Sequence, residues 1–281
     1  MRPTEVLRGL VEGKLELPED GLGFVRPSTL SQGCLLAVWH ELLGHPRAEP
    51  GARRRRIMQA GNAAHERIMG YLRPVLLARE LPFLEPELRI RGRCDALLNI
   101  PSSLGGEHAG FYVLEVKTTG SLGFSEIRAS GEPKVEHLRQ CLIYMRGIQG
   151  FYGIPVRGGL IYYEDRDTLA YKVFQVEYDE EPLRELLELL PEVIALARRG
   201  EEPKNPAFRL PPDHWAHRYC PYLPICPYGK EAVAASPREL PEAVKARIIA
   251  QGILNKRNKG TSKKRKGLRS LEELAREFGW E

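Results

Sequence analysis

The sequence predicts an α/β protein, and three observations support that class. Apolar residues recur at helical spacing in four long segments, and short runs rich in β-branched and aromatic residues lie between them. The order along the chain is helix, helix, strands, helix, strands, helix, which is typical of a sheet flanked by helices. We expect this domain to span residues 28–235, between a mixed leader (1–27) and a basic tail (236–281).

The two helices that precede the strands differ in character. The first is expected to start at Ser28 as its N-cap, to carry its apolar side chains over residues 30–43, and to end at the Gly and Pro that follow. The second begins with the arginine run 53–56 and continues to Leu72. Together these helices form an N-terminal helical part that leads into the sheet.

The remaining elements are read from shorter patterns. Two further helices are expected over residues 135–145 and 183–196, and a short terminal helix over 270–280. A Pro-rich stretch that contains cysteine occupies residues 203–227. Strands are expected over residues 75–81, 87–92, 94–100, 111–117, 159–163 and 169–178, with a hairpin joining the last two.

The composition indicates a globular chain that is neither disordered nor membrane-spanning. Of the 281 residues, 42% are hydrophobic and 28% are charged, and no apolar run reaches the roughly 18 residues of a transmembrane helix. Charged residues interrupt the first twenty positions, so we expect no signal peptide and a cytoplasmic protein. The five cysteines are therefore expected to be thiols or metal ligands rather than disulfides.

The net charge of +5 is unevenly distributed. Ten Lys and Arg and no acidic residue lie between Lys245 and Arg269, which leaves a net charge of −5 on the rest of the chain. Such a segment is expected to bind nucleic acid or another polyanion, or to serve only as a solubilising tail.

One strand combines two charged side chains on a single face. Glu115 and Lys117 are two positions apart, so both project from the same side, while Leu114 and Val116 point to the opposite, apolar side. Burying Glu and Lys together on a strand is costly unless the pair has a purpose. An exposed edge strand would produce the same pattern by chance. The pair therefore indicates a functional site only in combination with further residues.

Three further groups can join that pair at a metal site. Asp95, at a strand start, and Glu115 supply hard oxygen ligands suited to Mg²⁺ or Mn²⁺, and the backbone carbonyl of Val116 can add another. His65, in the second helix, adds an imidazole that suits Mn²⁺ better. Lys117 would then face the attacking water and a scissile phosphate.

Gln140 and Tyr144 complete the constellation on the third helix. They are four residues apart on one face and can therefore reach the site together. Each of these signals has an ordinary structural explanation when taken alone. Their joint occurrence, in this order and on these elements, indicates a catalytic site.

The ordered set of His65, Asp95, Glu115-Val116-Lys117 and Gln140-x-x-x-Tyr144 resembles the PD-(D/E)XK nuclease superfamily, over roughly residues 28–230. It is most similar to the branch of RecB and AddB nuclease domains and CRISPR-associated RecB-like exonucleases. The resemblance implies a restriction-endonuclease-like core, a mixed central sheet flanked by helices. It also implies that Asp95 and Glu115 bind metal with help from His65, that Lys117 positions the water, and that Gln140 and Tyr144 support Lys117 or contact substrate.

The cysteines divide into two groups. Cys94 and Cys141 lie next to motif residues inside regular elements and are expected to be buried, small apolar side chains. Cys34 and the pattern His217-x-x-Cys220-x₅-Cys226 are different, because related nucleases hold an iron–sulfur cluster with one early and three late cysteines. Here His217 replaces the first late cysteine.

This departure leaves the identity of the metal open. A Cys₃His set suits Zn²⁺, imidazole also ligates iron in some clusters, and the metal could have been lost. His214 is another candidate for the fourth ligand. In either metal form the site would be a structural clip that ties the C-terminal part of the domain to Cys34, 192 residues before Cys226.

Two surface features have competing explanations. The arginine run 53–56 is expected either to contact phosphate or to be a solvated helix start. Trp215, Tyr219 and Tyr222 can stack on bases, but packing around the clip is the favoured use.

The resulting expectation is a Mg²⁺- or Mn²⁺-dependent deoxyribonuclease. We expect an exonuclease that prefers single-stranded DNA ends and hydrolyses phosphodiesters with a metal-activated water, without a membrane partner. Its setting would be DNA repair and recombination, with helicase or recombination proteins, or CRISPR spacer acquisition with an integrase. A non-catalytic DNA-binding scaffold with a metal clip and an RNA-directed nuclease are the alternatives.

Overall fold

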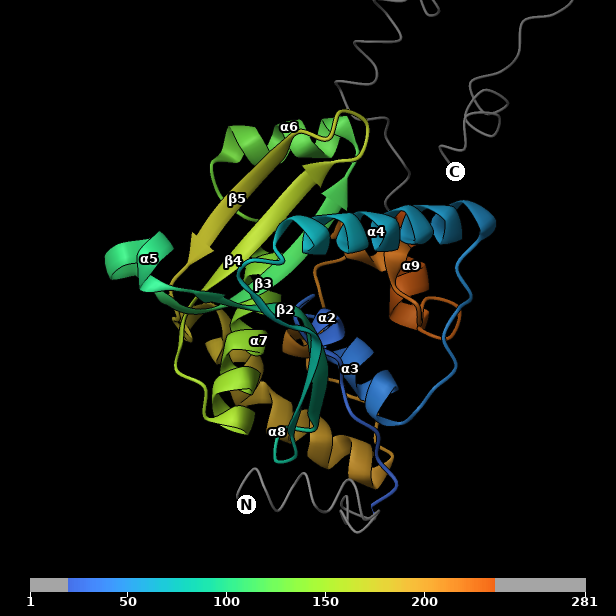
Figure 1. Ribbon diagram of the computed structural model, residues 1–281. Helices are drawn as coiled ribbons and strands as arrows, with labels where there is room; N and C mark the ends of the chain where they lie inside the picture. Colours follow the sequence, from blue (N-terminus) through green and yellow to red (C-terminus); the bar gives the residue numbers. More distant parts are fainter. Residues whose placement is uncertain (1–19, 236–281) are drawn as a thin grey trace, which may run out of the picture.

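The computed structural model describes residues 20–235 as one sheet with helices on both faces (Figure 1). The expected basic tail, its terminal helix and most of the expected leader lie outside these residues. The described elements, in chain order, are α2 (Pro27–Leu30), α3 (Leu35–Leu42), α4 (Ala52–Tyr71), β1 (Leu76–Glu85), β2 (Ile90–Ile100), α5 (Ser102–Gly105), η1 (Gly106–His108), β3 (Gly110–Thr119), α6 (Ser121–Ser130), α7 (Val135–Tyr152), β4 (Val156–Asp165), β5 (Tyr171–Val176), η2 (Glu181–Leu183), α8 (Arg184–Arg199), η3 (Pro206–Phe208), η4 (Trp215–Tyr219) and α9 (Pro227–Ala235).

The five strands form a mixed sheet in the order β1-β2-β3-β4-β5. Neighbouring strands are antiparallel except β3 and β4, which run parallel. A parallel pair needs a long crossover, and here α6 and α7 supply it. The expected α/β architecture with a mixed central sheet is therefore confirmed.

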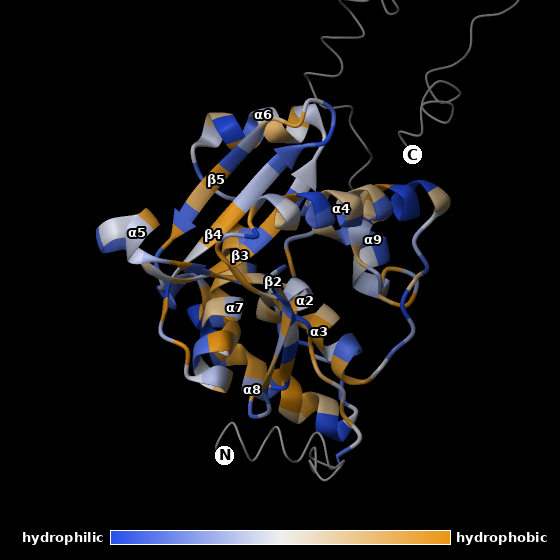
Figure 2. Ribbon diagram, in the orientation of Figure 1, coloured by the Kyte–Doolittle hydropathy of each residue, from blue (hydrophilic) through white to orange (hydrophobic). Residues whose placement is uncertain are grey.

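Two apolar layers hold the helices against the sheet. The larger one contains Val113 of β3 together with side chains of α3, α7 and α8. The smaller one packs Leu114 and Val116 of β3 against Ala64 and Ile68 of α4. Alternate residues of β3 thus enter opposite layers, as the two-residue period of a strand requires. In Figure 2 the apolar residues of α7 and α8 concentrate in the lower half of the fold, below the sheet.

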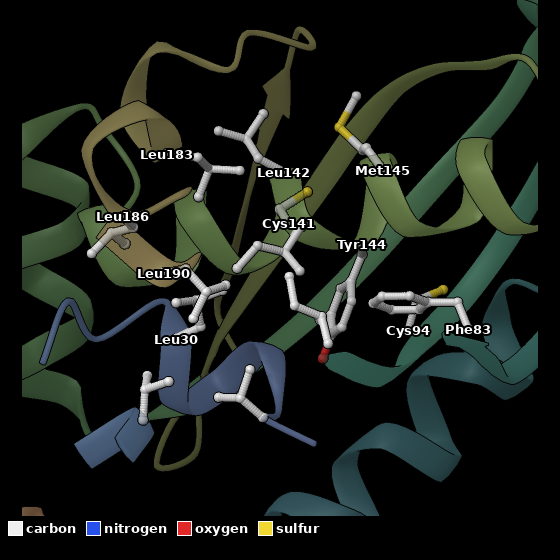
Figure 3. Packing of buried hydrophobic residues seen from close by; sticks show 14 of the residues in the cluster. Leu30, Phe83, Cys94, Cys141, Leu142, Tyr144, Met145, Leu183, Leu186 and Leu190 are labelled. Carbon is white, nitrogen blue, oxygen red and sulfur yellow. The ribbon is translucent and has the colours of Figure 1, made fainter. Parts of the chain in front are cut away.

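The larger layer brings distant parts of the chain together around α7 (Figure 3). Cys141 and Leu142 of α7 are fully buried, and Leu190 of α8 packs in the same layer. Phe83 of β1 meets the ring of Tyr144 edge-on, with centroids 6.0 Å apart. Because a well-packed interior leaves few voids, this layer fixes how α7 lies on the strands.

Several expected boundaries were wrong for local reasons. The single helix over residues 28–43 is two helices, because the chain turns at residues 31–34 and Gly33 adopts a left-handed conformation with φ of 81°. The first of these begins at Pro27, with Arg26 rather than Ser28 at its N-cap. The expected strands 87–92 and 94–100 form one strand, β2, and α5, α6 and α9 are helices that the sequence patterns did not predict.

Two other expectations concern burial and membranes. Cys94 and Cys141 are completely buried, as predicted, and all five cysteines carry free thiols. Within residues 20–235, no helix combines the length and the apolar character needed to cross a bilayer.

A close approach between α7 and β1 yields a stability prediction. A methyl group on Gly147 would overlap the ring of buried Phe83, whereas exposed Gly150, one turn later in α7, has open space around it. We expect Gly147→Ala to lower the free energy of unfolding by about 1–3 kcal/mol through overpacking. Gly150→Ala should instead raise it by up to about 1 kcal/mol through helix propensity.

Urea unfolding followed by circular dichroism measures both changes. Equal effects of the two substitutions would show that the Phe83 contact does not set the position of α7.

Candidate active site

The candidate site lies where β2 separates from β3. The two strands pair from Ala96 opposite Leu114 to Ile100 opposite Gly110, while β3 continues to Thr119 beside β4 alone. Beyond Leu114, the backbone of β3 therefore needs other partners on its β2 side. We call this junction the fork.

Two side chains satisfy the backbone of Val116 at the fork. The Val116 N–H donates to Asp95 Oδ2 at 2.8 Å, and His65 Nε2 lies 3.1 Å from the Val116 carbonyl oxygen. His65 Nδ1 is 3.8 Å from Asp95 Oδ2. The expected ligands from α4, β2 and the β3 backbone are thus adjacent.

The position of His65 depends on how α4 is attached to its surroundings. One turn after His65 along the helix, Ile68 is buried in the smaller apolar layer. Arg67 Nη2 lies 2.5 Å from Oε1 of buried Glu164 on β4, and Glu66 pairs with Arg79 on β1. These contacts hold the C-terminal part of α4, directly after His65, over the sheet.

On the other face of β3, Glu115 and Lys117 begin a polar chain that reaches α7. Lys117 forms an ion pair with Glu115 and donates to Gln140 Oε1 at 3.2 Å. Gln140 Nε2 donates in turn to the Tyr144 hydroxyl at 2.7 Å. The side chain of Glu115 is only 1% exposed, and its Oε2 has no hydrogen-bond partner among the described residues.

Burial controls the protonation of these groups. It raises the pKa of Asp95 to about 6, although the Val116 N–H and the charge of Lys117 act in the opposite direction. It also raises the pKa of Glu115 to about 7, opposed by Lys117. Burial lowers the pKa of Lys117, but the charge and hydrogen bond of Glu115 outweigh it, so the net shift is upward and the ammonium stays protonated at neutral pH.

This arrangement suits a divalent cation with oxygen ligands. Mg²⁺ in proteins commonly uses one or two carboxylates and keeps several waters. Asp95 and Glu115 would provide the carboxylates, and the unpartnered Oε2 of Glu115 is a buried acceptor that a cation would satisfy. The described part of the chain contains no group of three or more His, Cys, Asp or Glu spaced for direct metal coordination.

His137 is a neighbour of the site that sequence reasoning missed. Its Nδ1 lies 2.7 Å from the Tyr163 hydroxyl, which also accepts the backbone N–H of Lys134. Burial, together with the charges of Lys117 and Lys134, lowers the pKa of His137 to about 2, so its imidazole is neutral. Its spacing three residues before Gln140 on α7 was the available signal.

The candidate clip residues line one cavity of about 350 Å³ between α3 and the segment that contains η4 and α9. Cys34, Cys220, Cys226 and His217 all contribute to its wall, while His214 does not. Burial raises the pKa of Cys34, and it raises that of Cys220 to about 11. In the form described these thiols are therefore protonated.

His217 has one ring nitrogen bound to the backbone. Its Nε2 lies 2.9 Å from the Pro211 carbonyl, which fixes the hydrogen on that nitrogen and leaves Nδ1 as an acceptor. The structure thus brings the four candidate residues to one cavity without bringing them to coordination distance.

Comparison with known proteins places this geometry in context. The model of the PD-(D/E)XK nuclease superfamily matches residues 22–227. No curated protein sequence gives a significant match.

Solved structures that align with this chain include SSO0001, at 21% identity and a TM-score of 0.45 over 80% of this chain and 95% of that one. They also include the alkaline exonuclease LHK-Exo from Laribacter hongkongensis, at 15% identity and a TM-score of 0.45, over 64% and 90% of the two chains. The same exonuclease in complex with dAMP aligns at 16% identity with a TM-score of 0.43, over 64% and 90%.

The raised carboxyl pKa values predict how metal binding depends on pH. A cation binds the deprotonated carboxylates, so it must displace protons from Asp95 (pKa about 6) and Glu115 (about 7) as the pH falls. We expect the affinity for Mn²⁺ to fall roughly a hundredfold between about pH 8 and about pH 5.5.

Isothermal titration calorimetry in two buffers of different ionisation enthalpy measures both the affinity and the protons released. Glu115→Gln is the control, because it removes one titrating ligand and should flatten the dependence. Binding of Mn²⁺ without proton release near pH 6.5 would contradict the assignment of these carboxylates as ligands.

Proposed function

Because the chain belongs to the PD-(D/E)XK nuclease superfamily, we propose that it is a metal-dependent exonuclease that hydrolyses DNA at the fork and prefers single-stranded ends. The observation that carries the proposal is the convergence of Asp95, Glu115 and Lys117 with the satisfied backbone of Val116. Mere DNA binding requires no such set. A divalent cation held by Asp95 and Glu115 would activate water and offset negative charge on the phosphate.

In this proposal Lys117 acts as a fixed positive charge. Glu115 and Gln140 hold its ammonium from two sides, and the raised pKa keeps it protonated. A preorganised cation of this kind stabilises the charge that develops on a phosphate under attack, without reorganising at that moment. Lys117 therefore orients and stabilises rather than accepting a proton.

Gln140 and Tyr144 position that lysine. The side-chain carbonyl oxygen of Gln140 accepts a hydrogen bond from Lys117, and its amide nitrogen donates one to the Tyr144 hydroxyl. Tyr144 is in turn locked in the apolar layer by Phe83, so its hydroxyl is a rigid anchor for the amide. Gln140 is thus a positioning residue whose loss would loosen Lys117.

The depth at which the reactive groups lie supports the proposed preference for single strands. The side chains of Glu115, Asp95 and Lys117 are 1%, 15% and 25% exposed. A flexible single strand can bend its backbone into such a recess, whereas a stacked duplex is far stiffer.

We further propose an iron–sulfur cluster in the cavity lined by Cys34, Cys220, Cys226 and His217, as in the RecB- and AddB-like branch. What supports the proposal is that Cys34, Cys220, Cys226 and His217 all line this one cavity, and cysteine thiolates are the usual ligands of such clusters. The cluster would be structural and would close the fold between α3 and the segment before α9.

Two biological settings suit such an enzyme. It could trim DNA for CRISPR spacer acquisition beside an integrase, or process ends in repair and recombination beside a helicase. A neighbouring integrase gene would favour the first, and neighbouring replication or recombination genes the second.

The catalytic proposal predicts that Lys117→Ala loses cleavage. Removing one preorganised charge should lower the rate by at least roughly a hundredfold. End-labelled single- and double-stranded DNA and a matched RNA strand, each with and without Mn²⁺, measure rate and preference. Tyr178→Ala, an exposed tyrosine far from the fork, is the control and should keep the wild-type rate.

Full activity of the Lys117 variant, or activity that survives EDTA, would refute the mechanism. Preferential cleavage of the RNA strand would instead make this an RNA-directed nuclease.

The cluster proposal predicts a coloured protein. An anaerobic preparation should show a visible absorption band and stoichiometric iron, and Cys226→Ser should lose both because it removes a ligand. Cys94→Ser is the matched control, since Cys94 lies on β2, outside the cavity. A colourless sample that contains zinc would contradict the cluster.

A further inference from the structure

The first half of α4 is exposed to solvent all around the helix. Residues 51–60 are exposed at every position, including Ile57 at 38% and Met58 at 54%. This half of the helix extends past the sheet, as Figure 1 shows. Exposed apolar side chains among arginines are typical of an interaction surface.

The same face of α4 leads to the candidate active site. Arg54, Met58, Gly61 and His65 follow one another at spacings of four, three and four residues and therefore share a face. A Cβ at Gly61 would lie 3.6 Å from Thr118 Oγ1, so this part of the face meets β3 just beyond Lys117. From Arg54 to His65 the helix rises roughly 16 Å, the length of about five stacked nucleotides.

Two aromatic rings continue the surface across from Arg54. Trp215 and Tyr219 are 48% and 51% exposed, with centroids 5.9 Å apart. Arg54 Nη1 donates to the Tyr219 carbonyl at 3.3 Å, which joins the helix to this segment. Tyr222, by contrast, is 1% exposed and stacks on His40, so it alone of the three rings is committed to packing.

The charge of this surface is of one sign. No acidic residue occurs over residues 50–65, and Asp213 is the only one over residues 203–230. The chain outside the basic tail carries a net charge of −5, so this positive patch runs against the charge of its own domain. Guanidinium groups beside exposed rings are the combination that binds single-stranded nucleic acid.

We propose that Arg54, Met58, Trp215 and Tyr219 form a track for single-stranded DNA that leads to the fork. Arg54 contacts a phosphate, and the two rings stack on bases about five nucleotides from the reacting phosphate. The inference rests on the proposed nuclease function, since it names the path of that enzyme's substrate. It also gives a function to Trp215 and Tyr219, whose rings are about half exposed beside the proposed clip instead of packed against it.

The test measures binding of fluorescent dT₁₅ to full-length protein that carries Lys117→Ala, so that no cleavage occurs. We expect Trp215→Ala and Tyr219→Ala each to weaken binding about tenfold without changing its salt dependence, because they remove stacking. Arg54→Gln should reduce the slope of log affinity against log salt by about 0.7, which corresponds to one phosphate contact.

Arg157→Gln and Tyr178→Ala are the matched controls, because both residues lie near the opposite end of β4 and should leave affinity and slope unchanged. Thermal unfolding confirms that each variant is folded. Wild-type affinity and slope in all folded track variants would overturn the proposal, and so would track-dependent binding that is tighter for rU₁₅ than for dT₁₅.

Cleavage by otherwise wild-type protein separates this inference from the proposed function. If that protein cleaves DNA while the track variants bind normally, only the track is refuted. If it does not cleave but binds dT₁₅ through Trp215 and Tyr219, the track stands and the nuclease function fails.

Discussion

The site depends on one local problem of backbone hydrogen bonding. Where β2 leaves β3, the N–H and carbonyl of Val116 lose the partners that a continuous ladder would provide, and unpaired buried backbone groups are costly. Asp95 and His65 satisfy them. The groups that stabilise the end of the ladder are therefore the ones a cation would need. In the proposed mechanism Asp95 both accepts the Val116 N–H and binds the cation, so loss of Asp95 would disturb the end of the strand and the metal site together.

A second constraint is the burial of opposite charges on the neighbouring face. Glu115 and Lys117 are tolerable there because they pair with each other and because Gln140 and Tyr144 continue the hydrogen bonds into α7. The unfilled acceptor on Glu115 is the part that the protein leaves unsatisfied. The Lys117 ammonium is held by Glu115 and Gln140, whereas one oxygen of the Glu115 carboxylate has no partner among the described residues. A bound cation would satisfy that oxygen, and the ammonium would face a phosphate.

Sequence patterns predicted which candidate residues lie close together better than they predicted the boundaries of the helices and strands. The spacing of Glu115 and Lys117 placed both on one face of β3, and the spacing of Gln140 and Tyr144 placed both toward the same site, because these relations are local. The break between α2 and α3 depends on the conformation of Gly33, which an apolar helical pattern conceals. Three other features arise from contacts between distant segments, which a local residue pattern does not reveal. They are the continuity of β2, the fork, and the position of His137 beside Tyr163.

The cavity lined by Cys34 and Cys226 has a consequence for biosynthesis. Its two walls come from opposite ends of the domain, so it cannot close until residue 226 has left the ribosome. At about 5–20 residues per second, the 192 residues from 35 to 226 take roughly 10 to 40 seconds to synthesise. During that interval the Cys34 thiol lacks the wall that residues 217–226 provide. Closure of the cavity is therefore a late step in the synthesis of the domain, and oxidation of Cys34 on the nascent chain would precede it.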